Sequence, residues 1–176
     1  YGVQAAGAPS MYNSIRHHQK EILDRVSTIA DGIAVKNPGE LTYALCEKYV
    51  DDIVTVTDDE ISTAILALIE QQKLIAEGAG AVSVAAAMFN KVDIAGKKAA
   101  CLLSGGNIDV TILSRVITRG LLKAGRSADL TIALQDKPGQ LKDVSRIIAD
   151  LGGNVTSIHH DRANEGMDIN GCFLHI

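Results

Sequence analysis

The chain has 176 residues, 47% of them apolar, which is enough for one domain or two small ones with a hydrophobic core. Aromatic residues make up only 3% and Trp is absent, so the core is expected to be aliphatic, as in packed layers of helices and strands. The net charge of −4 and the lack of a basic block argue against a nucleic-acid partner, and no apolar run approaches the roughly 20 residues that span a bilayer.

Strand and helix signals alternate from the start of the chain. Residues 1–4 have the pattern of a strand end, and a helix is predicted from Pro9 or Ser10 to about Lys20. The small, polar loop over 27–32 contains Asp31, which either lines a site or simply forms a turn. Asn37 is the predicted cap of a helix that runs to about Tyr49, and a β-branched strand follows over 52–56.

Thr57 and Glu60 have the spacing of a capping box at the start of the next helix. The acids Asp58 and Asp59 are explained by the positive end of that helix, so no metal is expected there. Further on, Glu77 stands beside glycines just before a helix of small residues over 82–89. It either caps this helix or approaches a ligand, because nothing bulky shields it.

A short apolar run, Ala99–Leu103, ends in the polar turn Ser104-Gly105-Gly106-Asn107. A helical pattern follows from Asp109 to about Lys123, so the order predicts a buried strand, a tight turn and a helix start. In open α/β sheets ligands bind at the carboxyl ends of the strands, which makes the turn a candidate binding loop. The alternative is that the two glycines only let the chain turn. The residues expected to face the core from the helix are Val110, Leu113, Val116, Ile117 and Leu121.

Residues 125–128 are the best candidate linker, so two domains are expected at 1–124 and 129–176. The second begins with an alternating strand over 130–134 and a turn at 136–140. The remaining signals predict a helix closed by Gly152 and Gly153, a strand over 154–162, a turn at 164–166 and a strand over 167–176. This β-α-β-β order is the first part of a ferredoxin-like unit.

The three cysteines, Cys46, Cys101 and Cys172, lie far apart within apolar stretches. Their spacing fits neither a disulfide framework nor a zinc site, so buried thiols in a reducing cytoplasm are expected. Because the chain starts without a Met and ends inside a predicted strand, we expect a fragment of a longer protein.

Five stretches together resemble the C-terminal part of a threonine dehydratase (threonine ammonia-lyase) with one ACT regulatory domain. They are 28–32, 50–53, 77–80, 103–107 and 136–139. The resemblance implies part of an α/β, fold-type II, pyridoxal-phosphate enzyme followed by a partial ACT unit. That family converts threonine to 2-oxobutanoate and ammonia.

The resemblance also assigns roles to residues of the first domain. Ser104 would hydrogen-bond the pyridine nitrogen of the cofactor, with Gly105, Gly106, Asn107 and Glu77 around it and Asp31 at the substrate rim. A neutral hydroxyl does not hold the ring as a pyridinium, so the ring is a weaker electron sink, which favours elimination over transamination.

Two features of the family are absent or altered in this sequence. The Schiff-base lysine and the glycine-rich phosphate loop lie upstream in the family, and no matching motif occurs here, so the chain by itself is expected to be inactive. A loop that holds a cation in related serine racemases matches Gln4, Ala8 and Ser10, but both of its acids are missing. At most a monovalent ion is expected there.

The ACT half implies regulation by an amino acid such as isoleucine or valine, bound between two such domains of a homo-oligomer. The effector residues implied are Pro138, Gly139, Gln140, Leu141, Asn154 and Val155. A helix N-terminus offers NH groups to a carboxylate, although Gly139 and Asn154 also fit plain turn and strand-start positions. Two other functions stay open at this point: a non-catalytic amino-acid sensor, and a related serine dehydratase or racemase.

Overall fold

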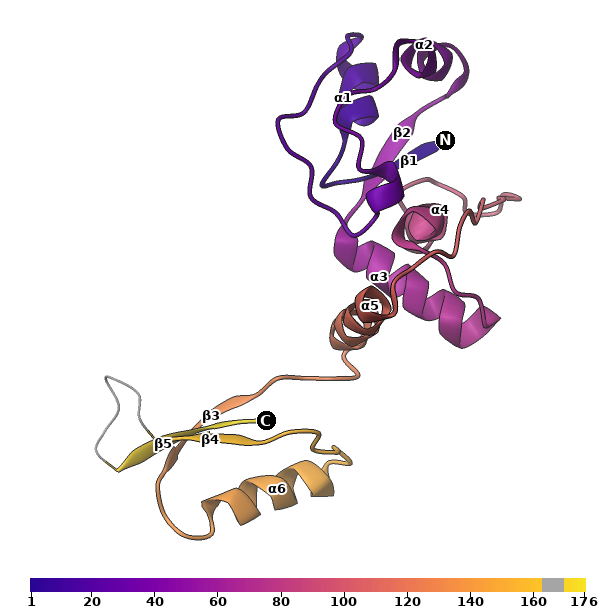
Figure 1. Ribbon diagram of the computed structural model, residues 1–176. Helices are drawn as coiled ribbons and strands as arrows, with labels where there is room; N and C mark the ends of the chain where they lie inside the picture. Colours follow the sequence, from indigo (N-terminus) through magenta and orange to yellow (C-terminus); the bar gives the residue numbers. More distant parts are fainter. Residues whose placement is uncertain (163–169) are drawn as a thin grey trace. The chain divides into compact units, whose positions relative to one another are not determined.

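The computed structural model describes residues 1–162 and 170–176. They form two compact units, Tyr1–Ser127 and Ala128–Ile176, each of which contains both helices and strands (Figure 1). This mixture confirms the predicted α/β class.

The first unit has a small parallel sheet with helices around it. Strand β1 (Gly2–Ala5) pairs with β2 (Ile53–Val56), with Gly2 opposite Ile53 and Ala5 opposite Val56. The two strands lie side by side in Figure 1. The helices are α1 (Ser10–His17), α2 (Glu40–Tyr49), α3 (Asp58–Ala67), α4 (Gly78–Met88) and α5 (Val110–Lys123), with short helical turns η1 (Asp31–Ile33) and η2 (Leu68–Gln72).

The core of this unit is aliphatic, as the composition predicted. Helix α3 is central, because it packs against both α4 and α5 and buries Ile61 and Ile65 completely. Small residues on α4 let it lie close to its neighbours. The buried cluster comprises Ala5, Ala30, Val56, Ile61, Ala64, Ile65, Leu68, Ala76, Ala81, Val82, Ala85, Ala86 and Val116.

Helix ends agree with the sequence signals only in part. The capping box is confirmed, since the Thr57 hydroxyl accepts from the Glu60 N–H at 3.3 Å and the Glu60 carboxylate accepts from the Thr57 N–H at 2.8 Å. Helix α1 ends three residues early, because His18 takes the left-handed conformation with φ of 52°. Helix α2 begins after Gly39 rather than Asn37, and no side chain caps it.

The buried strand predicted over Ala99–Leu103 is wrong. Residues 98–109 form neither helix nor strand, and the Leu102 side chain is 79% exposed. A strand needs a neighbouring strand to receive its backbone hydrogen bonds, and none of the described strands lies along this segment. It runs beside α4 instead, where the Ser83 hydroxyl donates to the Leu102 carbonyl at 2.8 Å.

Two further predictions about burial are corrected. Val110 is 76% exposed at the start of α5, whereas Val116 is buried against α3, as expected. Cys101 is exposed rather than buried, because it lies on the same coil segment. Cys46 is half-buried and Cys172 buried, and all three cysteines are free.

The second unit is a three-stranded antiparallel sheet with one helix. Its elements are β3 (Thr131–Gln135), α6 (Gln140–Asp150), β4 (His159–Asp161) and β5 (Gly171–His175), and β5 lies between the other two strands. The predicted β-α-β-β order is therefore confirmed, although β4 is shorter than expected. The turn expected at 164–166 and the start of the last strand at Met167 lie outside the described residues.

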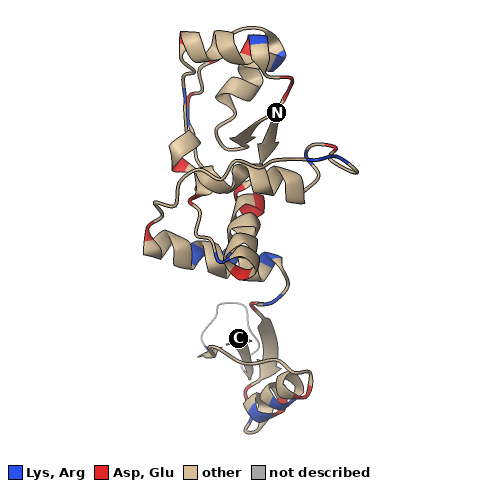
Figure 2. Ribbon diagram, turned by 90° about the vertical axis from the view of Figure 1, so that its right-hand side faces the viewer, with Lys and Arg blue, Asp and Glu red and all other residues tan. Residues whose placement is uncertain are grey.

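Acidic and basic residues are interspersed along both units (Figure 2). Within the described residues, no helix is both long and apolar enough to cross a bilayer.

Candidate functional site

A cleft of about 700 Å³ in the first unit brings together segments that are far apart in the sequence. Three of the predicted site residues, Asp31, Glu77 and Asn107, line this one cleft. The other lining residues are Thr28, Ile29, Gly78, Ile108, Asp109, Val110 and Ile112. The start of α4 and the start of α5 thus both face the same space.

Glycines allow these segments to meet backbone to backbone. A Cβ atom on Gly78 would lie 2.6 Å from the Ile29 carbonyl oxygen. A Cβ atom on Gly80 would lie 2.8 Å from the Gly105 carbonyl oxygen and even closer to the Ser104 carbonyl oxygen. Gly105 itself has φ of +80°, and a Cβ there would collide with the Glu77 carboxylate. The Glu77 N–H donates to the Gly105 carbonyl at 3.2 Å, which fixes the turn against the helix start.

Ser104 has a different position from the one its predicted role suggests. It is exposed beside α4 and does not line the cleft, although its neighbour Gly105 contacts the cleft residue Glu77. Within residues 1–162 and 170–176, the side chains of Glu77, Ser104 and Asn107 have no hydrogen-bond partner. They remain available to a ligand.

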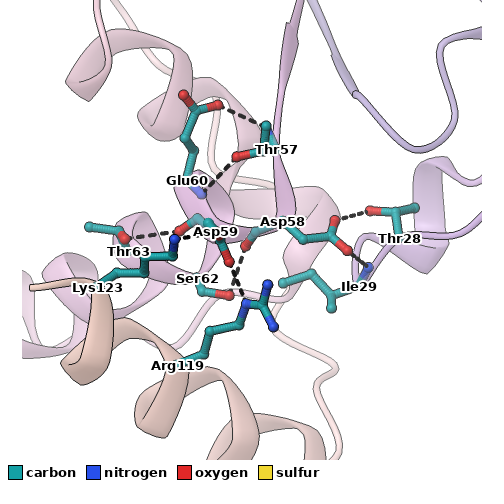
Figure 3. A network of polar contacts seen from close by, with 10 residues as sticks. All are labelled: Thr28, Ile29, Thr57, Asp58, Asp59, Glu60, Ser62, Thr63, Arg119 and Lys123. Carbon is teal, nitrogen blue, oxygen red and sulfur yellow. Dashed lines mark hydrogen bonds and ion pairs between the residues drawn. The ribbon is translucent and has the colours of Figure 1, made fainter. Parts of the chain in front are cut away.

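The loop that carries Asp31 is anchored to α3 through Asp58, whose role the sequence did not reveal. One carboxylate oxygen of Asp58 accepts from the Thr28 hydroxyl at 2.6 Å, and the other accepts from the Ile29 N–H at 3.2 Å (Figure 3). The Thr28 hydroxyl in turn accepts from the Ala30 N–H at 3.1 Å. The partners are about 30 residues apart, so no local pattern could have indicated this contact.

The next acid of α3 fixes α5 in the same way. Asp59 forms ion pairs with Arg119 and, at 2.9 Å, with Lys123 (Figure 3). At the other end of α5, Asp109 caps the helix, and its pKa is lowered by hydrogen bonds from the Thr111 hydroxyl and from the N–H groups of Thr111 and Ile112. Asp109 is therefore a carboxylate at neutral pH and places a negative charge at the cleft.

We expect acid to weaken the α3–α5 contact. The hydrogen bonds from Lys123 and Arg119 lower the pKa of Asp59 below its ordinary value of 3.8. Because this pKa is lower in the folded state than in the unfolded state, the Asp59 carboxylate stabilises the fold fully above its unfolded-state pKa. That stabilisation is lost as the pH falls through the folded-state pKa. For a partly exposed pair this amounts to about 1 kcal/mol or less. Urea unfolding at about pH 7 should give Asp59→Asn a lower free energy of unfolding than the wild type, and at about pH 2 the two values should converge. A difference that is the same at both pH values would contradict the stabilising role of the Asp59 carboxylate.

The loop considered for a cation has partners of its own. The Gln4 side-chain oxygen accepts from the Tyr12 N–H at 2.7 Å, and the Ser10 hydroxyl donates to the Val35 carbonyl at 2.7 Å. Ala8 is buried, and its N–H donates to the Ala5 carbonyl at 2.9 Å. These contacts account for both polar side chains without an ion.

The second unit contains a cavity of about 460 Å³ between the end of β3, the start of α6 and the sheet. Four of the six predicted effector residues, Pro138–Leu141, line it, whereas Asn154 and Val155 do not. Gly139 precedes α6 with φ of 98°, a conformation that favours glycine, and no side chain caps the helix. The Gln140 N–H donates to the Lys137 carbonyl at 3.4 Å, which leaves the N–H groups of Leu141 and Lys142 open to an anionic group.

Sequence reasoning missed several residues of this cavity. Asp136, His160, Arg162 and Cys172 line it, and Arg162 Nε lies 3.0 Å from Asp136 Oδ2. In the sequence, Cys172 alternates with Leu174, which is typical of one face of a strand and was a signal that Cys172 faces the core. Nothing local pointed to His160 or Arg162: sheet pairing places His160 beside β5, and Arg162 directly follows β4.

Sequence comparison matches both units to known families. Residues 1–105 match the family described as pyridoxal-phosphate dependent enzyme, and residues 128–174 match the ACT domain. The chain is 49% identical over 168 residues to an L-threonine ammonia-lyase of Thermotoga maritima, and 43% identical over 168 residues to one of Geobacter sulfurreducens. Each alignment covers 96% of this chain and 42% of the relative. The chain thus spans about two fifths of the length of the curated relatives it matches.

Comparison with solved structures also finds similarity to a threonine deaminase. The processed form of threonine deaminase isoform 2 from Solanum lycopersicum superimposes with a TM-score of 0.61 and 35% sequence identity. The superposition covers 69% of this chain and 34% of that chain.

Proposed function

Because the chain belongs to the pyridoxal-phosphate dependent enzymes and carries an ACT domain, we propose that it is part of an L-threonine ammonia-lyase that forms 2-oxobutanoate and ammonia. The identity of 49% over 96% of the chain to an L-threonine ammonia-lyase supports threonine over serine as the substrate. A non-catalytic sensor is less well supported, since the residues that line the cleft belong to the enzyme half.

The observation that carries this proposal is that Asp31, Glu77 and Asn107, which come from three separate segments, line one cleft. Glu77, Ser104 and Asn107 stand on segments packed against one another through glycines, beside a cleft that also contains Asp31. The fit to pyridoxal phosphate is chemical: the turn offers the Ser104 hydroxyl for a ring nitrogen, and the two glycines after it carry no side chain that could crowd a flat ring. When bound, the cofactor withdraws electrons from the substrate α-carbon.

The residues of this chain then have distinct tasks. The Ser104 hydroxyl would hold the ring nitrogen of the cofactor by donating a hydrogen bond, and a neutral hydroxyl would not supply the proton that a carboxylic acid could. Glu77 lies beside the turn that holds Ser104, and Asp31 faces the substrate from the rim of the cleft. A lysine that bonds the cofactor has no matching motif among the 176 residues, so the chain alone is proposed to be inactive.

The second unit is proposed to bind an amino-acid effector at Pro138–Leu141. Asn154 and Val155 stand away from this cavity, which supports a site completed by the same residues of a second copy in a homo-oligomer. Ile147 on α6 and Leu151 directly after its end are 56% and 83% exposed and offer apolar surface to such a copy.

The proposal is tested by measuring 2-oxobutanoate formation from L-threonine with the protein that carries this chain together with the cofactor lysine. Ser104→Ala is expected to lower kcat/KM by about tenfold, because one hydrogen bond to the ring contributes about 1 kcal/mol. Ser127→Ala, an exposed serine at the end of the first unit, is the matched control and should leave the rate unchanged.

Three outcomes would contradict the proposal. They are a Ser104→Ala enzyme with full activity, a clear preference for serine over threonine, and activity from the 176-residue chain alone. The same assay with isoleucine or valine present tests the effector half separately. A change in rate would support effector binding by the ACT domain, whichever substrate the enzyme prefers.

A further inference from the structure

Three potential metal ligands meet at the cavity of the second unit. A carboxylate oxygen of Asp136, a ring nitrogen of His160 and the sulfur of Cys172 all lie within 4.8 Å of one another. His160 Nε2 is 4.0 Å from Asp136 Oδ1, which is too long for a hydrogen bond. The three groups therefore surround a gap rather than satisfying one another.

The sheet register explains why they converge. His160 on β4 is opposite Leu174 on β5, and Cys172 lies two residues before Leu174. Alternate residues of a strand share a face, so His160 and Cys172 project from the same side of the sheet. Asp136 comes directly after β3, whose Leu134 is opposite Cys172, and this brings its carboxylate to the same point.

The donor set is selective in chemical terms. A thiolate, an imidazole and a carboxylate together suit Zn²⁺ and similar late first-row cations better than Mg²⁺ or Ca²⁺, which take oxygen ligands. Ligand atoms about 2.0–2.3 Å from one tetrahedral ion are roughly 3.3–3.8 Å apart, so shifts of about 1 Å would close the site. Asp136 and His160 are exposed and can make these shifts, while Cys172 is 2% exposed and fixed in the sheet.

The surroundings of the site favour this geometry. Arg162 Nε holds Asp136 Oδ2 at 3.0 Å, which leaves Oδ1 directed toward His160. Such outer contacts orient ligands in metal sites. Three protein ligands leave one coordination position of a tetrahedral ion open, and here it faces the cavity lined by Pro138–Leu141.

We propose that Asp136, His160 and Cys172 bind one late first-row divalent metal ion in the ACT domain, with its open position toward the cavity. This site is separate from the proposed cofactor chemistry of the first unit. Cysteine spacing along the chain does not indicate such a site, because the Cys172 thiol meets Asp136 and His160 through the sheet rather than along the chain.

Titration of the purified 176-residue chain with Co²⁺ tests the proposal directly. We expect one tightly bound ion, a thiolate-to-cobalt charge-transfer band in the near ultraviolet and intense visible bands of tetrahedral cobalt. Loss of a ligand in His160→Gln should weaken binding by more than about 100-fold, because even removal of contacts that only orient ligands costs about 10–100-fold. His160 is exposed, so this change should leave the fold intact. Cys172→Ser should remove the charge-transfer band.

Two matched controls distinguish this site from adventitious binding. His159→Gln changes the neighbouring histidine, which projects from the opposite side of β4, and Cys101→Ser removes the exposed thiol of the first unit. Both should bind Co²⁺ like the wild type. The proposal is overturned if the wild type shows no charge-transfer band, if His160→Gln binds as tightly as the wild type, or if either control abolishes the band.

Discussion

Replacing Gly80 with alanine is expected to lower the free energy of unfolding of the first unit by about 1–3 kcal/mol, the usual cost of overpacking. Alanine is a better helix former than glycine by about 1 kcal/mol, so helix propensity alone predicts that the substitution stabilises the unit. The added Cβ would lie 2.8 Å from the Gly105 carbonyl oxygen and closer to that of Ser104. Backbone atoms cannot rotate away as a side chain can, so α4 and the 104–107 turn must separate.

Gly120→Ala is the matched control for this experiment. Gly120 is also buried within a helix, but a Cβ there would have no contact under 3.0 Å: Leu66 Cδ2 would lie at 3.1 Å, Leu66 Cβ at 3.3 Å and the Ser62 carbonyl oxygen at 3.4 Å. A flexible side chain can move by a few tenths of an ångström, so the change should cost little or even stabilise. Urea unfolding of both variants measures the difference. Equal stabilities would show that the turn does not pack against α4 as described.

Replacing Asp58 with asparagine should cost about 1–3 kcal/mol, because both of its carboxylate oxygens accept hydrogen bonds from the loop that lines the cleft. An amide has a single acceptor oxygen, and its NH₂ group would face either the Thr28 hydroxyl or the Ile29 N–H. With the NH₂ group toward Ile29 one loop anchor is lost; with it toward Thr28 the hydroxyl must accept instead of donate, and both bonds to the charged carboxylate become weaker bonds to a neutral amide. Amide hydrogen exchange near residues 28–31 should therefore accelerate more than exchange in the core of α3.

Asp59→Asn is the neighbouring control. It removes one negative charge from the same first turn of α3, so the interaction with the helix dipole changes equally. Its ion pairs with Arg119 and Lys123 are more exposed, and its cost should stay at about 1 kcal/mol or less without any change at the 28–31 loop. If the two variants behave alike, Asp58 acts only as a helix-end charge.

The elements that were predicted well depend on neighbours in the chain. The Thr57–Glu60 capping box and the start of α5 after Asp109 depend on residues only a few positions apart, so side-chain type and spacing suffice to predict them. Ile61 and Ile65 of α3 are four residues apart, a spacing typical of the buried face of a helix, and both are fully buried.

The failed predictions depend on what lies beside a segment. Ala99–Leu103 has the apolar character of a strand, but a strand exists only where another strand accepts its hydrogen bonds, and α4 occupies that side. Val110 fits the apolar period of α5, but the helix starts at the cleft rather than over α3, so its side chain is exposed.

Residue type and local spacing were enough to indicate the α/β class, most helices and the candidate residues Asp31, Glu77 and Asn107, because these signals depend on groups only a few residues apart. Only the tertiary structure brought those residues into one cleft, anchored the Asp31 loop through Asp58, and collected Asp136, His160 and Cys172 at one point of the second unit. The physical reason is that these contacts join groups 12 to 76 residues apart, and backbone packing at glycines and strand register, rather than any local pattern, determine which of them meet.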